Sequence, residues 1–460
     1  FFRSAFFFEN RFPSRSLHFI RFRPAAAPVF QRVFSVRLNV RLLRLFFILL
    51  LMHGCTTGMR FTATLDAIDH GATPFAVGAM LSCVALFPAF FAVGAGRWLD
   101  RTGAQKPMRL AFLCVCAAGG AALLFPTDAA GVAPLFLSCF LVGVAFLLTN
   151  TVVQRLTGDF SSPEGRTNAF VVLSMVTAGS GLVTPVVTGY MIEHFGFRVF
   201  YAWCVAAAVL LFVLALTPVL GSILSGAPRN RAKGAGRGRA VDLLKDPAMR
   251  AILAASVFIS VGWEVGNLLI PVYCRSVELS PSHIGWILGS FSLASFFVRL
   301  LMPMLTRRLG EWRLISFTML VAGAAFSLFP LFTDLFALMA CSFLLGMGLG
   351  ASMPNLMSLI YRLSPADRIG EAIGLRLMLM NLSKASFPAL MGALGTAVGA
   401  GASLWGLAVF LFGGFGFAMR MRPTVTRALA EKSTRAAKSA KTESTEGANK
   451  AEAAPPKAER

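Results

Sequence analysis

The chain consists mainly of long apolar stretches in which charged residues are rare, separated by short polar connections. A stretch of about 20 apolar residues is long enough to cross the hydrocarbon core of a bilayer as an α-helix. Twelve such stretches lie at roughly 43–64, 74–95, 108–126, 132–153, 168–191, 198–220, 250–273, 282–304, 314–332, 335–359, 371–396 and 402–420. Membrane β-barrels use short segments of alternating polarity, which these continuous runs do not resemble. The pattern predicts an all-α polytopic membrane protein with twelve transmembrane helices.

Composition and charge point to a lipid bilayer as the partner and away from nucleic acid. Hydrophobic residues make up 56% of the chain and charged residues 14%, whereas roughly a quarter of the residues in a soluble domain are charged. Most of the net charge of +22 falls in the N-terminal segment, in every second connection and in the C-terminal tail. The basic residues of those connections are Arg97, Arg101, Lys106 and Arg109, then Arg155 and Arg166, then the run 229–250, then Arg307, Arg308 and Arg313, then Arg362 and Arg368. The positive-inside rule then predicts a protein of the cell inner (plasma) membrane with both termini in the cytoplasm.

Three segments fall outside the predicted spans. Residues 1–40 are rich in Phe and Arg and precede the first methionine, Met52, so we expect this basic N-terminal extension not to be native along its whole length. Residues 221–249, rich in Gly, Pro and Arg, are expected to form a cytoplasmic linker. Residues 422–460, rich in Ala, Lys, Glu and Ser, are typical of a disordered cytoplasmic tail.

The linker divides the spans into two sets of six that repeat one another. A Pro-x-x-x-Gly motif occurs four times, at 74–78, 185–189, 281–285 and 388–392. The third copy follows the first by 207 residues, and the fourth follows the second by 203. Such nearly constant offsets indicate two parallel copies of one unit. We therefore expect two six-helix bundles, at 41–220 and 250–421, related by a pseudo-twofold axis along the membrane normal.

The connection between the second and third spans carries a compact motif, Gly96-Arg97-Trp98-Leu99-Asp100-Arg101-Thr102-Gly103. We expect Gly96 to let the helix end pack closely and Gly103 to supply a turn with positive φ. Asp100 is placed to face an arginine or a helix N-terminus.

This motif, together with the repeated six-helix layout, resembles the major facilitator superfamily over about residues 41–421. In that family the motif braces the two halves on the cytoplasmic side and is released as the transporter switches. The resemblance therefore implies a cytoplasmic gate at Gly96, Asp100, Arg101 and Gly103. It departs from the family pattern at Ala104 and Gln105, which stand where two basic residues are usual.

The fifth span carries Gly181, Pro185 and Gly189 at intervals of four, a spacing that allows close helix approach. Pro388 and Gly392 repeat it in the eleventh span. The fifth-span motif partly resembles the signature of exporters in the family, although Thr184 and Thr188 replace two of its glycines. Efflux and a purely packing role both remain open from this motif.

Ionisable side chains inside spans are costly and usually functional. Glu264 lies in the seventh span and Arg60 in the first, the equivalent span of the other half. The resemblance implies that these two spans face each other across the cavity. We therefore expect Arg60 and Glu264 to form an ion pair across the pseudo-twofold axis, or Glu264 to carry the coupling proton. The alternative is a structural pair that fixes the register of the halves. Asn267, Lys384 and Asn150 are further candidates for the path of substrate or protons. The excess of positive charge favours an anionic substrate.

Two other arginines, Arg299 and Arg376, lie nearer the cytoplasmic ends of their spans. We expect both to extend toward the membrane surface, with contact to the Asp100 segment as the alternative for Arg376.

No catalytic, phosphate-binding or metal-binding motif is present in the sequence, so we predict no enzyme, no cofactor and no metal site. The predicted function is secondary active transport of a small solute by alternating access, coupled to protons, with efflux favoured and the protein acting as a monomer. The alternatives are a proton-coupled uptake symporter of an organic anion or sugar, and a sensor on the same scaffold that transports nothing.

Overall fold

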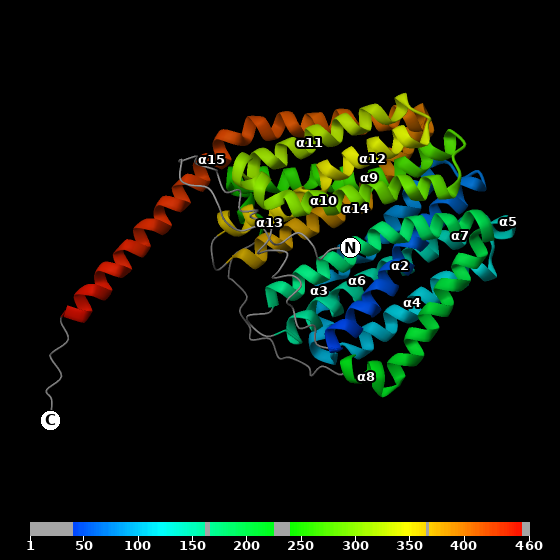
Figure 1. Cartoon of the computed structure of the whole chain (residues 1–460), viewed down its shortest axis with the longest axis horizontal. Helices are drawn as coiled ribbons and strands as arrows, with labels where there is room; N and C mark the ends of the chain where they lie inside the picture. The colour runs from blue at the N-terminus through cyan, green and yellow to red at the C-terminus, as the bar shows by residue number, and fades with distance from the viewer. Residues whose placement is uncertain (1–39, 162–165, 225–239, 365–367, 453–460) are drawn as a thin grey trace, which may run out of the picture. The chain divides into compact units, whose positions relative to one another are not determined.

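The computed structural model describes residues 40–161, 166–224, 240–364 and 368–452, and no strand occurs within these ranges. In the first half the helices are α2 (Val40–Asp69), α3 (Pro74–Thr102), α4 (Gln105–Leu124), α5 (Thr127–Ala130), α6 (Ala133–Asp159), α7 (Arg166–Leu216) and α8 (Pro218–Leu224). In the second half they are η1 (Ala240–Lys245), α9 (Pro247–Ser276), α10 (Pro281–Leu309), α11 (Glu311–Leu328), η2 (Phe329–Leu331), α12 (Leu335–Gly350), α13 (Ser352–Leu363), α14 (Ile369–Val398) and α15 (Ala400–Glu452). Figure 1 shows α2–α8 gathered in one bundle and α9–α15 in a second.

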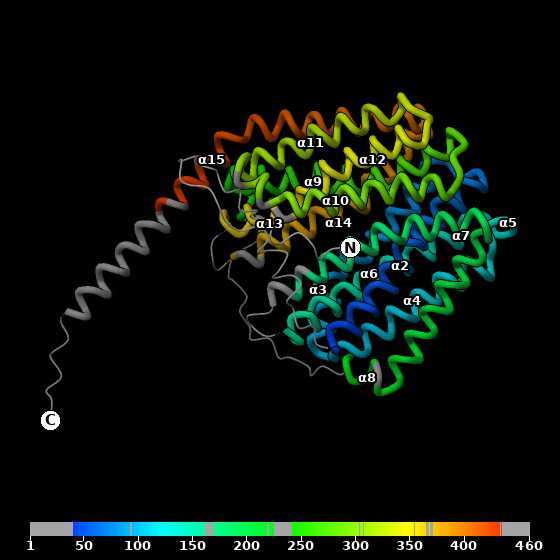
Figure 2. The backbone as a smooth tube through the Cα atoms, in the orientation of Figure 1, coloured from blue at the N-terminus to red at the C-terminus, as the bar shows by residue number. Residues whose placement is uncertain are grey.

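These helices provide twelve membrane crossings. Eleven stretches within the described ranges are long and apolar enough to span a bilayer. One of them, at 172–216, has 45 residues, about twice what a single crossing needs. It lies in α7, whose backbone leaves helical geometry at Gly196 (φ 80°, ψ 169°), and the chain turns back there (Figure 2). The fifth and sixth predicted spans are therefore separate crossings, and the expected twelve are confirmed.

The two bundles begin and end equivalent helices in the same way. Thr73 and Ser280, 207 residues apart, cap the N-termini of α3 and α10 through their hydroxyl oxygens, and a proline follows each. At the other ends of these helices, Gly103 and Gly310 both have a φ of 78°, which a residue with a Cβ rarely adopts. We name the end near Gly103 and Gly310 the basic end, and the end near Thr73 and Ser280 the acidic end.

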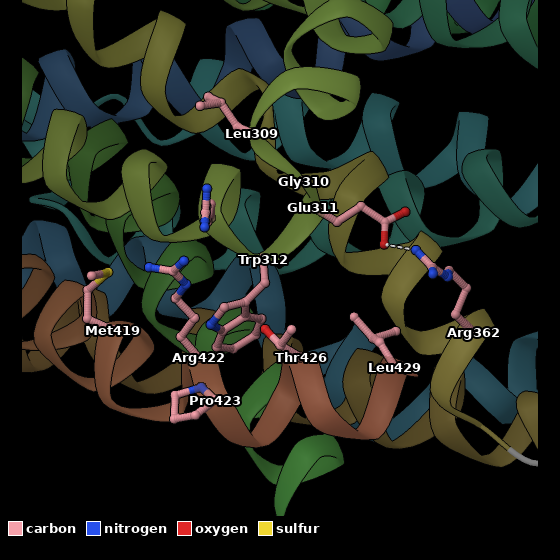
Figure 3. Close-up of a pocket in the computed structure, with 11 residues that line it drawn as sticks. Leu309, Gly310, Glu311, Trp312, Arg362, Met419, Arg422, Pro423, Thr426 and Leu429 are labelled. Atoms are coloured by element: carbon pink, nitrogen blue, oxygen red, sulfur yellow. Dashed lines mark hydrogen bonds and ion pairs between the residues drawn. The ribbon is translucent and has the colours of Figure 1, made fainter. Parts of the chain in front are cut away.

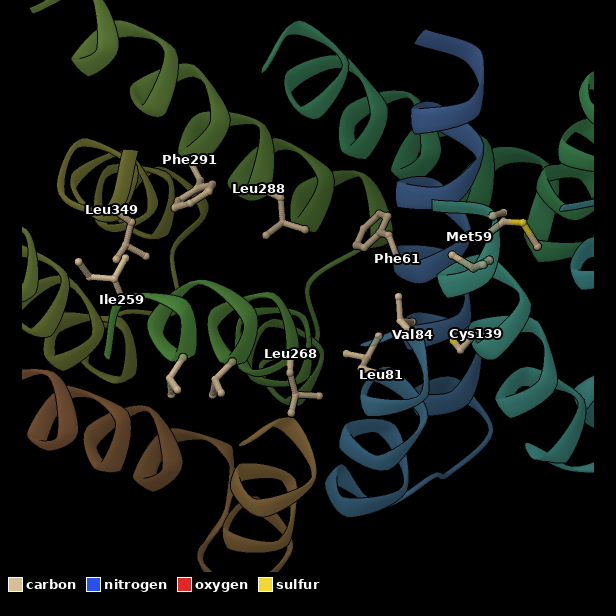
Figure 4. Packing of buried hydrophobic residues seen from close by; sticks show 14 of the residues in the cluster. Met59, Phe61, Leu81, Val84, Cys139, Ile259, Leu268, Leu288, Phe291 and Leu349 are labelled. Atoms are coloured by element: carbon tan, nitrogen blue, oxygen red, sulfur yellow. The ribbon is translucent and has the colours of Figure 1, made fainter. Parts of the chain in front are cut away.

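Buried apolar side chains of both bundles form one large cluster. Met59, Phe112 and Tyr201 are almost completely buried in the first bundle, as are Ile259 and Phe326 in the second. Figure 4 shows side chains of this cluster on their helices. Large apolar side chains remain exposed on the described helices, which is expected where lipid is the solvent.

The segments outside the predicted spans differ in part from expectation. Helix α9 begins at Pro247, three residues before the predicted bundle. Helix η1 lies within the predicted linker, and α8 extends into its start. The prediction of a disordered tail from residue 422 is wrong as far as Glu452, since α15 continues to that residue. Ala, Lys and Glu are strong helix formers, which explains the continuation. The predictions for residues 1–39 and 453–460 lie outside the described residues.

The four Pro-x-x-x-Gly motifs pack against one another in reciprocal pairs that join the two bundles. A Cβ added to Gly78 of α3 would come within 2.2 Å of the Pro388 carbonyl oxygen on α14, and one added to Gly392 within 2.3 Å of the Pro74 oxygen. The pair between α7 and α10 repeats this arrangement, because Gly189 and Gly285 approach the Pro281 and Pro185 oxygens in the same way. Backbone contacts this close require glycine.

Candidate functional site

A carboxylate between two cations lies where the bundles meet. Glu264 of α9 is only 8% exposed. Its Oε2 accepts a hydrogen bond from Nη2 of Arg60 on α2 at 3.1 Å, and its Oε1 lies 2.9 Å from Nζ of Lys384 on α14. We call Arg60, Glu264 and Lys384 the ion triad. Each oxygen of Glu264 is thus held by a different helix. Both contacts are between ionised groups, whose hydrogen bonds are the stronger ones in proteins.

Local sequence explains why these side chains meet. Gly262 and Gly266 lie two residues before and after Glu264 and pack against Leu411 and Phe326 in the core of the second bundle. Because positions two apart point to nearly opposite sides of a helix, Glu264 faces away from that core and toward the first bundle. Lys384 precedes Pro388 by one helical turn, so it lies on the side of α14 that packs against α3.

The triad carries a net positive charge, because one acid faces two bases. The carboxylate is buried, whereas the side chains of Arg60 and Lys384 keep 28% and 31% of their surface exposed. Both cations are therefore accessible to a negatively charged solute while the acid is shielded by them.

The other predicted path residues do not join the triad. Asn150 donates a hydrogen bond to the Phe146 carbonyl of its own helix at 2.9 Å. Asn267 is half-buried and lines a small apolar hollow with Trp263 and Phe291. No hydrogen bond connects either asparagine to the triad within the described structure.

The predicted gate motif is mostly helical. Gly96 to Thr102 form the last turns of α3, and only Gly103 turns the chain. Close packing at Gly96 was expected and is wrong, since a Cβ there would meet open space. Asp100 Oδ1 lies 3.3 Å from Nη1 of Arg155 on α6, a helix of the same bundle. Arg101 is exposed.

The second repeat makes its acid contact from the following helix. Its copy of the motif has no acid before Gly310, but Glu311 follows directly and starts α11. Glu311 accepts hydrogen bonds from Ser358 Oγ at 2.5 Å and from Arg362 Nη1 at 2.8 Å. Ser358 follows Arg155 by 203 residues, the offset of the repeat in this region. The acid contact thus joins α11 to α13 in the second repeat, whereas it joins α3 to α6 in the first.

Arg376 differs from expectation. It is 4% exposed, so it does not extend to the membrane surface and has no contact with Asp100. Its Nε donates to Ser256 Oγ at 3.2 Å, and its two Nη atoms lie against the sulfur atoms of Met353 and Met357.

Polar side chains connect the bundles at the acidic end, and sequence reasoning missed them. Glu193 Oε2 accepts the backbone N–H of Ser282 at 2.9 Å, and Thr396 Oγ1 accepts that of Phe75 at 3.0 Å. The acceptors lie eight residues after Pro185 and Pro388, so the repeat offset could have located them. Arg275 also donates from Nε to Asp69 Oδ1 at 2.8 Å. We call these three contacts the acidic-end seam.

The triad and the acidic-end seam join the two bundles through hydrogen bonds and ion pairs. At the basic end, the Asp100–Arg155 and Glu311–Arg362 contacts each lie within one bundle. The bundles are therefore fastened at the acidic end and at the triad.

Two bundles of six crossings, joined by a charged triad and by polar contacts at one end, define a polytopic transporter of the alternating-access type. The family model of the Major Facilitator Superfamily matches residues 45–278 and 252–454. The chain belongs to the major facilitator superfamily, whose members carry small molecules across membranes and are not enzymes.

Solved structures of transporters share the fold. A POT family transporter in complex with a thioalcohol-conjugated peptide aligns with a TM-score of 0.68 at 14% identity, covering 84% of this chain and 96% of that one. A peptide transporter POT in complex with sulfate gives 0.66 at 16% identity, covering 84% and 95%. An inward-facing, unoccupied bacterial homolog of the human lysosomal transporter Spinster gives 0.65 at 15% identity, covering 84% and 98%. No curated protein matches the chain in sequence.

Proposed function

We propose that this protein is a symporter that carries a small organic anion together with a proton across the plasma membrane. The observation that carries this proposal is the shared carboxylate of Glu264, which neutralises Arg60 from one bundle and Lys384 from the other.

The triad couples a proton to an anion by simple charge balance. When Glu264 is ionised, it occupies Arg60 and Lys384 and competes with any other anion for them. When Glu264 binds a proton, both cations lose their acceptor, and a carboxylate of the solute can take its place. Proton and anion then favour each other's binding, and this coupling is reciprocal. Two species that bind cooperatively to one site move together.

A cationic substrate fits the same geometry poorly. The one acid of the triad is already paired with two bases, so a cation would have to displace them and would meet a net positive field. The fifth-span motif does not restore the exporter interpretation, because Pro185 and Gly189 are used in the contact with α10. Among the predicted directions of transport, we therefore favour uptake driven by an inward proton gradient over efflux.

The structure corresponds, in this proposal, to the state open to the cytoplasm. The positive-inside rule assigns the basic end to the cytoplasm, with both termini on that side. The bundles are fastened at the opposite end by the acidic-end seam. Asp100, Arg101 and Gly103 at the basic end would then form the cytoplasmic gate, with the exposed Arg101 available to the other bundle when that end closes. The inward-facing Spinster homolog supports this assignment by similarity of fold.

The solute class is also supported by comparison. A POT family relative in fold holds a conjugated peptide, and another holds sulfate. Free carboxylates and sulfate share the negative oxygens that two cations recognise.

The proposal is tested by flux into proteoliposomes under an inward proton gradient. The panel comprises monocarboxylates, dicarboxylates, dipeptides, sugars and cationic dyes, with wild type, Glu264→Gln and the control Glu278→Gln, an exposed acid at the acidic end. We expect gradient-driven accumulation of one anionic class in wild type and the control. In Glu264→Gln we expect exchange of that anion without accumulation. Gradient-driven export of the cationic dyes instead would refute the proposal.

A further inference from the structure

A cavity lies at the basic end of the second bundle, away from the triad. It has a volume of about 660 Å³ and is formed where α11 begins, α13 ends and α15 passes alongside. Figure 3 shows its residues, with Trp312 of α11 facing Arg422 and Thr426 of α15. Transport by alternating access has no evident use for a cavity on this side of one bundle.

The cavity has two unpaired cations. Arg362 is neutralised by Glu311 at 2.8 Å. Arg313 and Arg422 also line the cavity, and neither has an acidic partner among the described residues. Two guanidinium groups in one cavity can both donate hydrogen bonds to the same oxyanion, such as phosphate.

The remaining wall is apolar. Leu309, Met419 and Leu429 line the cavity beside the arginines. Leu309 and Met419 are 36% and 43% exposed. Trp312 forms a fixed floor, because it is buried and its Nε1 donates to the Ala418 carbonyl at 2.9 Å. A free phosphate would use only the arginines, whereas a lipid would use the apolar wall as well.

The position matches the membrane surface. Gly310 ends α10 and Glu311 starts α11, so the cavity sits at the ends of two crossings, at the level of lipid headgroups. Tryptophan is enriched at this depth, and basic pockets between transmembrane helices hold anionic headgroups. We propose that the cavity binds the phosphate headgroup of an anionic phospholipid, with Arg313 and Arg422 on the phosphate and the apolar wall against the start of the acyl chains.

This site does not depend on the transported solute, so its test does not depend on the proposed function. Full-length protein in a neutral detergent is titrated with phosphatidylglycerol, phosphatidylcholine or inorganic phosphate, and bound lipid is counted by native mass spectrometry. The variants are Arg313→Gln/Arg422→Gln and the matched control Arg420→Gln, an exposed arginine of α15 that does not line the cavity.

We expect wild type and Arg420→Gln to retain one phosphatidylglycerol molecule tightly and phosphatidylcholine weakly. The double variant should bind phosphatidylglycerol roughly 25-fold more weakly, because each arginine near anionic lipid contributes about a factor of five. The double variant Arg313→Lys/Arg422→Lys should recover most of the binding. Equal binding by the double glutamine variant and by the control would overturn the proposal. Competition by inorganic phosphate at the same concentration as the lipid would also overturn it, because the ligand would then be a soluble anion.

Discussion

Glu193 accepts the backbone N–H of Ser282 at 2.9 Å and thereby caps, from the first bundle, the first helical turn of α10 in the second. Its repeat counterpart, Thr396, caps α3 from the second bundle in the same way. Each bundle thus caps a helix of the other bundle, and opening of the acidic end would break both hydrogen bonds. The free energy of these caps therefore favours the state in which the acidic end is closed.

Loss of a cap should favour opening of the acidic end. For Glu193→Ala we expect the fraction of molecules with separated acidic ends to rise by up to roughly fivefold, because a cap contributes about 1 kcal/mol. Distances between spin labels on Ala130 and Leu331, which lie at that end in different bundles, measure this fraction. Glu278→Ala is the control, and an equal change in both variants would contradict the role of the cap.

The close backbone contacts predict which glycines tolerate a methyl group. Gly78→Ala places a Cβ within 2.2 Å of the Pro388 carbonyl oxygen, and such overpacking costs about 1–3 kcal/mol. We expect a lower melting temperature and loss of transport. Gly120→Ala on α4 meets no neighbouring atom within 4 Å and should be neutral or slightly stabilising. A Gly78→Ala variant as stable and active as Gly120→Ala would show that the bundles do not pack this way.

Removal of one cation from the triad should weaken anion binding and spare proton coupling. In Lys384→Gln, Glu264 keeps its contact with Arg60 at 3.1 Å, and the net charge of the site falls to zero. We expect the KM for the anion to rise roughly 10- to 100-fold, because this is the loss of affinity that removal of one hydrogen bond to a charged group causes. Flux should still be driven by the proton gradient. Lys106→Gln, at the basic end, is the matched control. An unchanged KM in Lys384→Gln would remove Lys384 from the binding site.

Stability should depend on pH through His70, which directly follows α2. The Asp66 carbonyl and the Asp128 carboxylate, each 2.7 Å from a ring nitrogen, raise the pKa of His70 above its ordinary 6.5. The folded chain therefore binds this proton more tightly than the unfolded chain does. The stabilisation is complete below about pH 6.5 and is lost as the pH rises through the folded-state pKa.

The melting temperature of wild type should accordingly fall as the pH increases from about 6 to 8. His70→Gln should show a flatter profile over the same range, measured by thermal denaturation in detergent. A variant that keeps the full slope would locate the titrating group elsewhere.

Much of the architecture could be predicted from the sequence because lipid imposes a simple rule of length and polarity. The twelve crossings and the repeat required no knowledge of side-chain contacts. The alignment of the repeats also placed Arg60 and Glu264 in equivalent spans, and the family resemblance implied that these spans face each other.

The contacts between side chains of different helices were harder to predict. Sequence reasoning placed Lys384 in the path but did not foresee that it shares one carboxylate with Arg60, because that depends on where α14 crosses α9. It assigned Asp100 to a loop, whereas the helix continues to Thr102. It missed Glu193 and Thr396 because a carboxylate or hydroxyl near a helix end carries no sign of its partner in another bundle.

Cooperative binding of proton and anion at Glu264 can be measured by mixing detergent-purified protein with the transported anion in weakly buffered solution containing a pH indicator. We predict that wild type takes up a proton from solution as the anion binds, and that Glu264→Gln binds the anion without proton uptake. Release of a proton from wild type on anion binding, or equal uptake by Glu264→Gln, would contradict it.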